Sequence, residues 1–279
     1  MASSLAVRVW GARGLLPRLV EGQEQHGGNT TCIEVLHQGL EPIVLDAGTG
    51  VANLGDQILA HHSPEVPIHV FLTHHHWDHI MGLPFFGPIY RQGVQVNLYG
   101  RDSQLGESQA MLDTLFSPFY SPIYSPDNLL ASLSLLAPLG PVEIGQLRIS
   151  ALTIPGSHPG GAWVIKIEQD GRSLVFAPDV ELRVPAVRSA FVRFCADCDL
   201  LLCDATYDEE TYARAVGWGH SSLEVSHQVG HEAGVGQVMG IHFGPTRSDE
   251  ELMRAVGAGN DRFPETVLTT AREGQRYEV

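Results

Sequence analysis

The sequence predicts a layered α/β protein in which two β-sheets pack face to face and helices cover their outer sides. Strand-like segments are followed by helix-like segments in both halves of the 279-residue chain. No linker-like stretch and no internal repeat of fixed length divides it. We therefore expect residues 1–279 to form a single domain.

The first half of the chain contains short apolar segments rich in β-branched residues, which is typical of strands. The expected strands are Ala6–Trp10, Thr31–Leu36, Ile43–Leu45, Ile68–Leu72 and Gln95–Tyr99. Gly48-Thr49-Gly50 leads into a helix-like stretch, Val51–Ala60, and a second helical pattern lies around Ser103–Leu115.

The segment Phe116–Leu139 differs in composition from its surroundings. It repeats a Ser-Pro dipeptide and interleaves aromatic residues, at Ser117-Pro118, Ser121-Pro122 and Ser125-Pro126 with Phe116, Phe119, Tyr120 and Tyr124. Because proline lacks a backbone N–H and has a fixed φ, we expect no regular structure here. We interpret residues 116–139 as an inserted lid or a dimer contact, and a plain packed loop is an equally good interpretation.

The second half returns to strands and helices. The expected strands are Leu147–Leu152, Trp163–Glu168, Ser173–Ala177, Leu200–Cys203 and Gln237–Ile241. Asp170-Gly171 predicts a tight hairpin between two of them. The expected helices are Ala186–Phe194, Leu223–Ala233 and Asp249–Val256, the last with Ser248 as its N-cap.

Composition narrows the class of protein. The formal charge of −15 argues against long nucleic acid as a partner, because phosphate backbones are bound by Lys and Arg. The sequence shows no secretory signal and no apolar run long enough to span a bilayer, so we expect a cytoplasmic protein. Cys195-Ala196-Asp197-Cys198, with Cys203 nearby, could bind a metal or act in redox chemistry. Small buried residues near a strand are the preferred interpretation.

One run of residues points to metal binding: Thr73-His74-His75-His76-Trp77-Asp78-His79, which contains the pattern H-x-H-x-D-H. Three imidazoles and a carboxylate this close together are unfavourable unless a cation neutralises them. Imidazole suits zinc and iron, and carboxylate suits harder ions or bridges two metals. The run follows an expected buried strand, where α/β folds place their chemistry. A solvated histidine-rich loop is the weaker alternative.

Later strand ends supply further candidate ligands. His158 lies in Ser157-His158-Pro159-Gly160, Asp179 follows Ala177-Pro178, and His242 follows Gly240-Ile241. Each comes just after an apolar strand and close to Gly or Pro, which lets the backbone approach a site closely. Any one of them alone would more often be a surface or capping residue.

The order H-x-H-x-D-H, His, Asp, His resembles the metallo-β-lactamase fold superfamily over nearly the whole chain. This resemblance implies a four-layer αβ/βα sandwich with a dinuclear metal site at the edge between its sheets. It further implies that one metal binds His74, His76 and His158, that the second binds Asp78, His79 and His242, and that Asp179 bridges both. In the superfamily a residue at Asp46 braces a ligand histidine, although a turn-capping Asp is an equally good interpretation.

Within the superfamily, several stretches resemble the phosphodiesterase-like branch of tRNA 3′-processing endonucleases and bacterial cyclic-nucleotide phosphodiesterases. They are Trp10-Gly11-Ala12-Arg13-Gly14, Gly27-Gly28-Asn29-Thr30, His158-Pro159-Gly160-Gly161 and Gly219-His220-Ser221-Ser222. The resemblance implies that His220 contacts the scissile phosphate and that Asp204 orients it. The chain departs from the branch after His242, where Arg247 could meet a phosphate or form a surface ion pair. It also has no long basic arm for gripping tRNA.

The resulting hypothesis is a hydrolase of a small phosphodiester, such as a cyclic nucleotide. A hydroxide bridging two divalent metals would attack phosphorus, Asp78 would help orient it, and His220 would protonate the leaving oxygen. Zn²⁺ is the expected metal, with Mn²⁺ or Fe²⁺ as alternatives, and a homodimer is possible. Other hypotheses are a thioester, lactone or β-lactam hydrolase, a non-enzymatic metal-bound sensor, and, more distantly, a redox di-iron protein.

Overall fold

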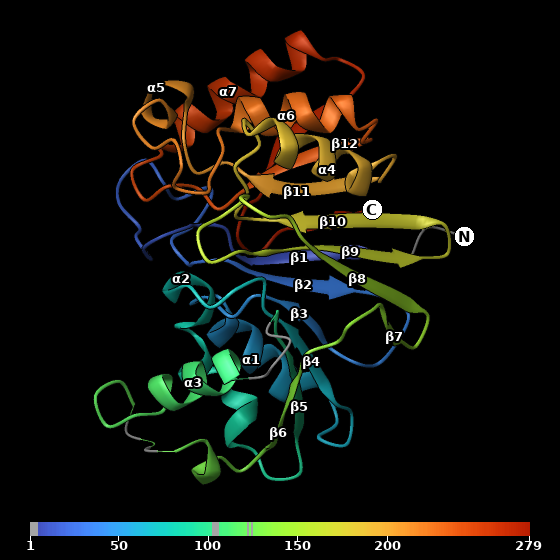
Figure 1. Ribbon diagram of the computed structural model, residues 1–279. Coiled ribbons are helices and arrows are strands. Elements are labelled where there is room, and N and C mark those ends of the chain that lie inside the picture. The colour runs from blue at the N-terminus through green and yellow to red at the C-terminus, as the bar shows by residue number, and fades with distance from the viewer. Residues whose placement is uncertain (1–4, 102–105, 122, 124) are drawn as a thin grey trace.

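Two β-sheets form the centre of the computed structural model, which describes residues 5–101, 106–121, 123 and 125–279 (Figure 1). Within these residues each sheet has seven strands. The first sheet has the spatial order β14 (Arg276–Glu278), β1 (Ala6–Gly11), β2 (Cys32–Leu36), β3 (Ile43–Leu45), β4 (Ile68–Phe71), β5 (Gln95–Tyr99) and β6 (Ser132–Leu136). The second has the order β13 (Val267–Thr270), β12 (Gln237–Ile241), β11 (Leu200–Asp204), β10 (Arg172–Ala177), β9 (Trp163–Gln169), β8 (Leu147–Thr153) and β7 (Val142–Ile144).

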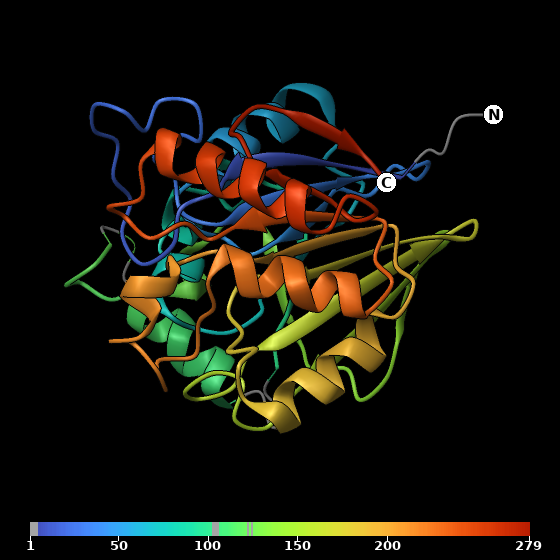
Figure 2. The same cartoon turned by 90° about the horizontal axis from the view of Figure 1, so that it is seen from above.

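Helices cover the outer sides of both sheets, as Figures 1 and 2 show. The first sheet carries α1 (Val51–His61), α3 (Gly106–Leu115) and the short α2 (Trp77–Ile80), together with 3₁₀ turns at Leu83–Phe85, Gly87–Tyr90 and Pro126–Asn128. The second carries α4 (Pro185–Cys195), the short α5 (Glu209–Tyr212), α6 (Leu223–Glu232) and α7 (Asp249–Arg262). The expected four-layer sandwich is therefore confirmed.

The period-2 alternation of strand side chains divides the core. Ile43 and Leu45 of β3 belong to a cluster that also contains Ile165 and Ile167 of β9, so these side chains fill the space between the sheets. Val44, between them in sequence, belongs to a second cluster with α1. One strand thus joins two layers of the core.

Parallel strands bring sequence-distant residues to one edge of the sandwich. β10, β11, β12 and β13 are parallel neighbours in the second sheet, and β3, β4, β5 and β6 are parallel neighbours in the first. Asp179 and His242 follow the carboxyl ends of β10 and β12, and Asp204 ends β11. Loops at such strand ends are where open α/β sheets bind their ligands.

Two local predictions are confirmed by backbone geometry. Asp170 and Gly171 both have positive φ, 51° and 77°, as a tight turn between β9 and β10 requires. Ser248 caps α7 in a capping box: its hydroxyl accepts the Glu251 N–H, and the Glu251 carboxylate accepts the Ser248 N–H.

The segment 116–139 is only partly as expected. The prediction of no regular structure is wrong at its end, where β6 pairs in parallel with β5. No proline occurs between Pro126 and Pro138, and the alternating Ser and Leu of 132–136 suit a half-buried strand. Phe119, in the turn that follows α3, is 93% exposed. Pro122, Tyr124 and the expected helix start at Ser103 lie outside the described residues.

The cysteines are packing residues in the described structure. Cys195, Cys198 and Cys203 are free and buried. Burial raises the pKa of Cys198 and of Cys203 to about 12, so both thiols stay protonated and unreactive at neutral pH. Over the described ranges, no helix combines the length and the apolar character needed to cross a membrane.

Candidate metal centre

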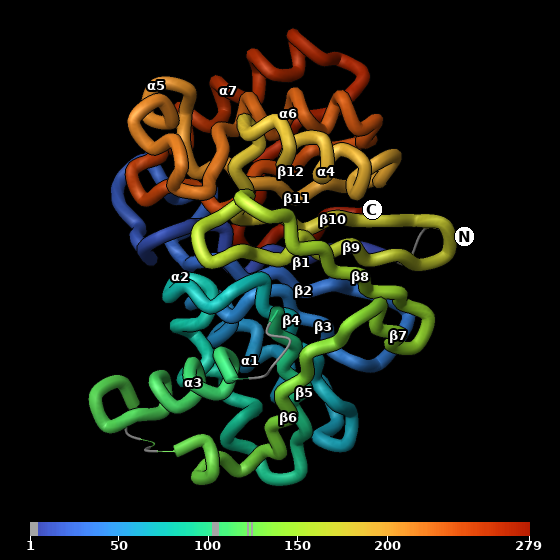
Figure 3. The backbone as a smooth tube through the Cα atoms, viewed as in Figure 1, coloured from blue at the N-terminus to red at the C-terminus, as the bar shows by residue number. Residues whose placement is uncertain are grey.

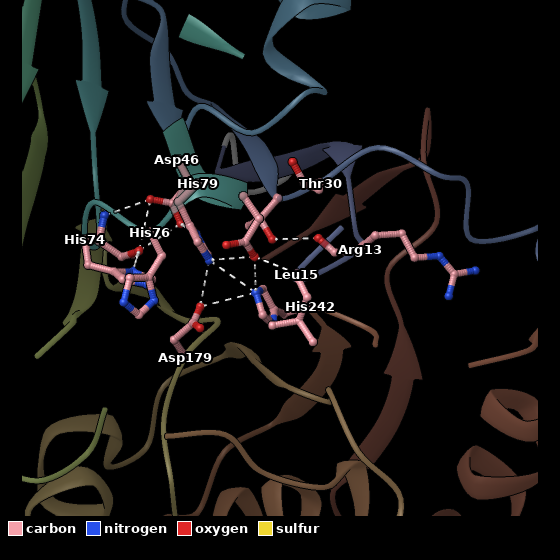
Figure 4. A network of polar contacts seen from close by, with 12 residues as sticks. Arg13, Leu15, Thr30, Asp46, His74, His76, His79, Asp179 and His242 are labelled. Atoms are coloured by element: carbon pink, nitrogen blue, oxygen red, sulfur yellow. Dashed lines mark hydrogen bonds and ion pairs between the residues drawn. The ribbon is translucent and has the colours of Figure 1, made fainter. Parts of the chain in front are cut away.

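The predicted ligands converge at the edge where the two sheets meet (Figure 4). The loop after β4 carries His74 and His76, and α2 carries Asp78 and His79. The ligand atoms fall into groups with spacings no larger than 4.8 Å: His74 with His76 and His158, Asp78 with His79 and His242, and His74 with His79 and Asp179. Two further groups include His220, with His158 and Asp179 and with Asp204 and His242.

The spacing of the ring nitrogens fits metal coordination. His158 Nε2 lies 3.0 Å from His76 Nδ1, and His79 Nε2 lies 3.2 Å from His242 Nε2. Two imidazole nitrogens on a tetrahedral zinc ion, each about 2.0–2.1 Å from it, are roughly 3.3 Å apart. His74 Nε2 is buried and has no hydrogen-bond partner. An orphaned nitrogen beside a set of converging ones is what a metal site requires, so the residues present fit divalent ions.

Two of these histidines are fixed by acceptors on their Nδ1 atoms. His79 Nδ1 donates to Asp46 Oδ2 at 2.7 Å, and His158 Nδ1 donates to the Gly219 carbonyl at 3.0 Å. Because a carboxylate and a carbonyl can only accept, both rings carry a proton on Nδ1 and turn Nε2 toward the site. Asp46 therefore braces a candidate ligand.

Two threonines fix the other two tautomers. Thr73 Oγ1 donates to the Asp46 carboxylate and lies 3.1 Å from His74 Nδ1. Thr206 Oγ1 donates to the backbone carbonyl of His242 and lies 2.9 Å from its Nδ1. Because each hydroxyl donates its only proton to another oxygen, it accepts a hydrogen bond from the imidazole N–H. Four rings thus direct Nε2 toward the site.

Two residues of the site, Asp46 and His242, have strained backbone conformations. Asp46 and His242 have φ values of 58° and 61°, in the left-handed region that residues other than glycine adopt rarely. Each such residue costs of order 1–3 kcal/mol and persists only where the surroundings over-determine it. Both residues belong to the imidazole network, which links the strain to the site.

The two carboxylates in the cluster face several imidazoles. Asp78 Oδ2 accepts the Leu15 N–H at 2.7 Å and lies 2.9 Å from His242 Nε2. Asp179 Oδ2 lies 3.0 Å from His79 Nε2 and 3.5 Å from His242 Nε2. Burial would raise the pKa of each carboxyl, but the neighbouring imidazoles outweigh it and hold both pKa values below the usual range. Both groups are therefore anionic.

His220 lies against this cluster and is held by Asp204. Its Nδ1 is 3.0 Å from Asp204 Oδ2, and its ring is centred 5.2 Å from those of both His158 and His242. The Asp204 carboxylate also accepts the backbone N–H groups of Val180 and Thr206, which fixes its orientation. Burial would lower the pKa of His220, but the Asp204 charge and hydrogen bond raise it to about 9.

Sequence reasoning missed Glu181, a buried carboxylate two residues after Asp179. Glu181 accepts the Gly217 N–H at 2.8 Å, the Gly219 N–H at 3.0 Å and the Tyr212 hydroxyl at 2.8 Å. It thereby ties the loop that carries Asp179 to the loop that leads into His220. The available signal was an acidic residue in an otherwise apolar stretch, Val180-Glu181-Leu182.

Glycine is required at position 219. Its φ is +87°, and a Cβ there would lie 2.3 Å from His158 Nδ1. Any side chain would therefore displace the imidazole that the Gly219 carbonyl holds.

Arg247 forms an ion pair in the described structure. Its Nη1 lies 3.3 Å from Asp208 Oδ2. Of the two roles predicted for it, the ion pair is thus observed, although the arginine side chain is buried and not on the surface.

Comparison with known proteins agrees with this architecture. A family model described as a beta-lactamase superfamily domain matches residues 42–243, well over half of the chain. The chain therefore belongs to the beta-lactamase superfamily. The uncharacterised protein Rv1339 of Mycobacterium tuberculosis is 25% identical over 226 residues, which are 79% of this chain and 76% of that protein.

Solved structures share the fold at low sequence identity. The metallo-beta-lactamase fold protein YhfI from Bacillus subtilis matches with a TM-score of 0.69 and 19% identity, over 99% of both chains. A diphosphatase from the PhnP family matches with a TM-score of 0.69 and 16% identity, over 99% of this chain and 98% of that one.

Proposed function

We propose that the chain is a metal-dependent phosphodiesterase that hydrolyses a small phosphodiester, such as a cyclic nucleotide. The observation that carries the proposal is the His220–Asp204 pair beside the metal-ligand cluster, at 3.0 Å between Nδ1 and Oδ2. Ester hydrolysis at phosphorus expels an alkoxide, which needs a proton, and a positioned histidine can supply it. The likeness to a PhnP-family diphosphatase is a second, weaker support.

Two divalent ions, with Zn²⁺ favoured over Mn²⁺ or Fe²⁺, would lower the pKa of the attacking water and stabilise charge on the phosphate oxygens. His74, His76 and His158 would hold one, Asp78, His79 and His242 the other, and Asp179 both. The Asp78 carboxylate would also orient the attacking water, and Leu15 N–H fixes one of its oxygens.

The pair that carries the proposal has a defined proton path. Asp204 accepts from Nδ1 of His220, so Nε2 is the nitrogen that would deliver a proton to the leaving oxygen. Asp204 also accepts two backbone N–H groups, which hold its carboxylate in the orientation that accepts from Nδ1. His220 is then a general acid, and Asp204 is the positioning residue that fixes its tautomer.

A substrate panel tests the reaction class. The metal-defined protein should hydrolyse bis-p-nitrophenyl phosphate and cyclic nucleotides, and should leave nitrocefin and a thioester intact. Turnover of nitrocefin or the thioester without turnover of any phosphodiester would replace the proposal with its main alternative.

A single substitution tests the role of His220. His220→Ala should lower kcat for an alkoxide leaving group by about 10²–10⁴-fold, and should affect p-nitrophenolate, which departs without a proton, far less. Metal content should stay that of the wild type. The exposed His61 on α1, changed to Ala, is the matched control. If His220→Ala loses metal and activity in equal measure, His220 is a ligand and not the acid.

A further inference from the structure

A cavity of about 560 Å³ opens directly beside the proposed metal centre. His74 and His76 contribute to its lining, and so do residues of α3. His220 is not among the described residues that line it. The volume lies within the range of small-molecule sites, about 300–1,000 Å³, and leaves room for a group of nucleoside size.

The walls of this cavity are mainly apolar. Ile80, Met111 and Leu115 are buried side chains that line it, and Trp77 adds an aromatic surface that is 48% exposed. The Trp77 ring also packs against the Tyr120 ring, with ring centroids 5.6 Å apart. A partly exposed indole beside buried apolar side chains favours a planar aromatic ligand, because such a ligand buries apolar surface and packs its ring against the indole.

The charges at the rim are already balanced. Arg101 Nη2 donates to the Gly160 carbonyl at 2.6 Å and lies 3.6 Å from a carboxylate oxygen of Glu107. The hydroxyl of Thr114 donates to a backbone carbonyl of its own helix. Among the described lining residues these polar groups already have partners, so we expect the cavity to select mainly by shape and apolar surface.

The position of the cavity identifies which part of a phosphodiester it faces. The His158 ring is centred 4.8 Å from His76, at the cavity, and 5.2 Å from His220, the proposed acid. Because His76 lines the cavity and His220 does not, a leaving oxygen next to His220 lies outside the cavity, which leaves the cavity to the other ester substituent. We propose that the cavity binds the substituent that stays on phosphorus, and that this substituent carries a planar aromatic group such as a nucleobase. The assignment rests on the proposed phosphodiesterase function.

Two substrates with one leaving group test this directly. Phenyl p-nitrophenyl phosphate and methyl p-nitrophenyl phosphate both release p-nitrophenolate and differ only in the retained substituent. Burial of the phenyl ring should raise kcat/KM about 10- to 100-fold over the methyl diester. Equal kcat/KM values would overturn the cavity assignment and leave the phosphodiesterase proposal standing.

A matched pair of variants locates the preference. Ala110 lines the cavity, and Gln109, the preceding residue of α3, is exposed and outside the lining. Ala110→Trp should fill the cavity and reduce the phenyl-to-methyl ratio to near one, whereas Gln109→Trp should retain the wild-type ratio. Thermal unfolding of both variants checks that each is folded. A folded Ala110→Trp protein with the full phenyl preference would refute the assignment.

A binding measurement keeps the test independent of turnover. Titration calorimetry of the metal-loaded protein with phenyl phosphate and methyl phosphate should show at least tenfold tighter binding of the phenyl compound, and Ala110→Trp should abolish the difference. If no diester is hydrolysed but this difference is found, the aromatic site stands and the proposed reaction falls. If the two monoesters bind equally, the aromatic site is refuted.

Discussion

Removal of the Glu181 carboxylate should destabilise the protein and disturb its site together. Glu181→Ala leaves the Gly217 and Gly219 N–H groups and the Tyr212 hydroxyl without the acceptor that now holds them at 2.8–3.0 Å. A buried donor without a partner costs about 1–3 kcal/mol, and the loop can relax toward water at Gly217, so we expect a loss of roughly 2–4 kcal/mol. Urea unfolding of the metal-free protein measures it.

The same change should lower kcat more than it raises KM. The carbonyl of Gly219 holds His158, and the next residue is His220, so a displaced loop misplaces both imidazoles. A shift of about 1 Å can cost about 10²-fold in rate. Glu181→Gln keeps one acceptor oxygen and should recover part of both losses. The exposed Glu210→Ala is the control. A Glu181→Ala protein as stable and as active as that control would refute the reasoning.

Three further outcomes follow from the site and its surroundings. Asp46→Ala removes the acceptor that holds His79 Nδ1 at 2.7 Å and should weaken metal affinity about 10- to 100-fold, which competition with a chelating dye measures. Gly14→Ala should also release metal, because a Cβ there would lie 2.3 Å from the His242 ring; unchanged metal content would contradict the close approach. The pKa of the buried His26 is lowered by desolvation, so the unfolded chain takes up a proton below the ordinary histidine pKa while the folded protein does not. Its stability contribution is thus present at neutral pH and is lost as the pH falls toward that lowered folded pKa. The thermal unfolding temperature should therefore decrease as the pH is lowered from about 7 to 5. This decrease should be smaller in the His26→Asn variant.

The sequence was sufficient to single out the candidate ligands because their signal is local. H-x-H-x-D-H places four of them within six residues, and His158, Asp179 and His242 each follow an apolar strand. Strand ends of adjacent parallel strands meet at one edge, so the order of elements alone brings them together.

The supporting residues were harder to predict because their partners are distant in sequence. Glu181 accepts backbone N–H groups that lie more than thirty residues away, and the hydroxyl of Thr206 contacts the ring of His242. Neither residue type is diagnostic alone. The strands β7, β13 and β14 were also missed, since each has only three or four residues and pairs at a sheet edge or with a distant partner.

The order in which the site residues leave the ribosome has a consequence for how the protein matures. The elements that lead into the site come from distant parts of the chain, as the colours of α2, β10 and β12 in Figure 3 show. The His74–His79 run is synthesised early, but Asp179 and His242 complete the cluster only after β10 and β12 have joined the second sheet. Long-range contacts of this kind form slowly. We therefore expect tight metal binding only after β12 has joined the sheet, because a nascent chain that ends before β12 already contains His158 and Asp179 but still lacks His242.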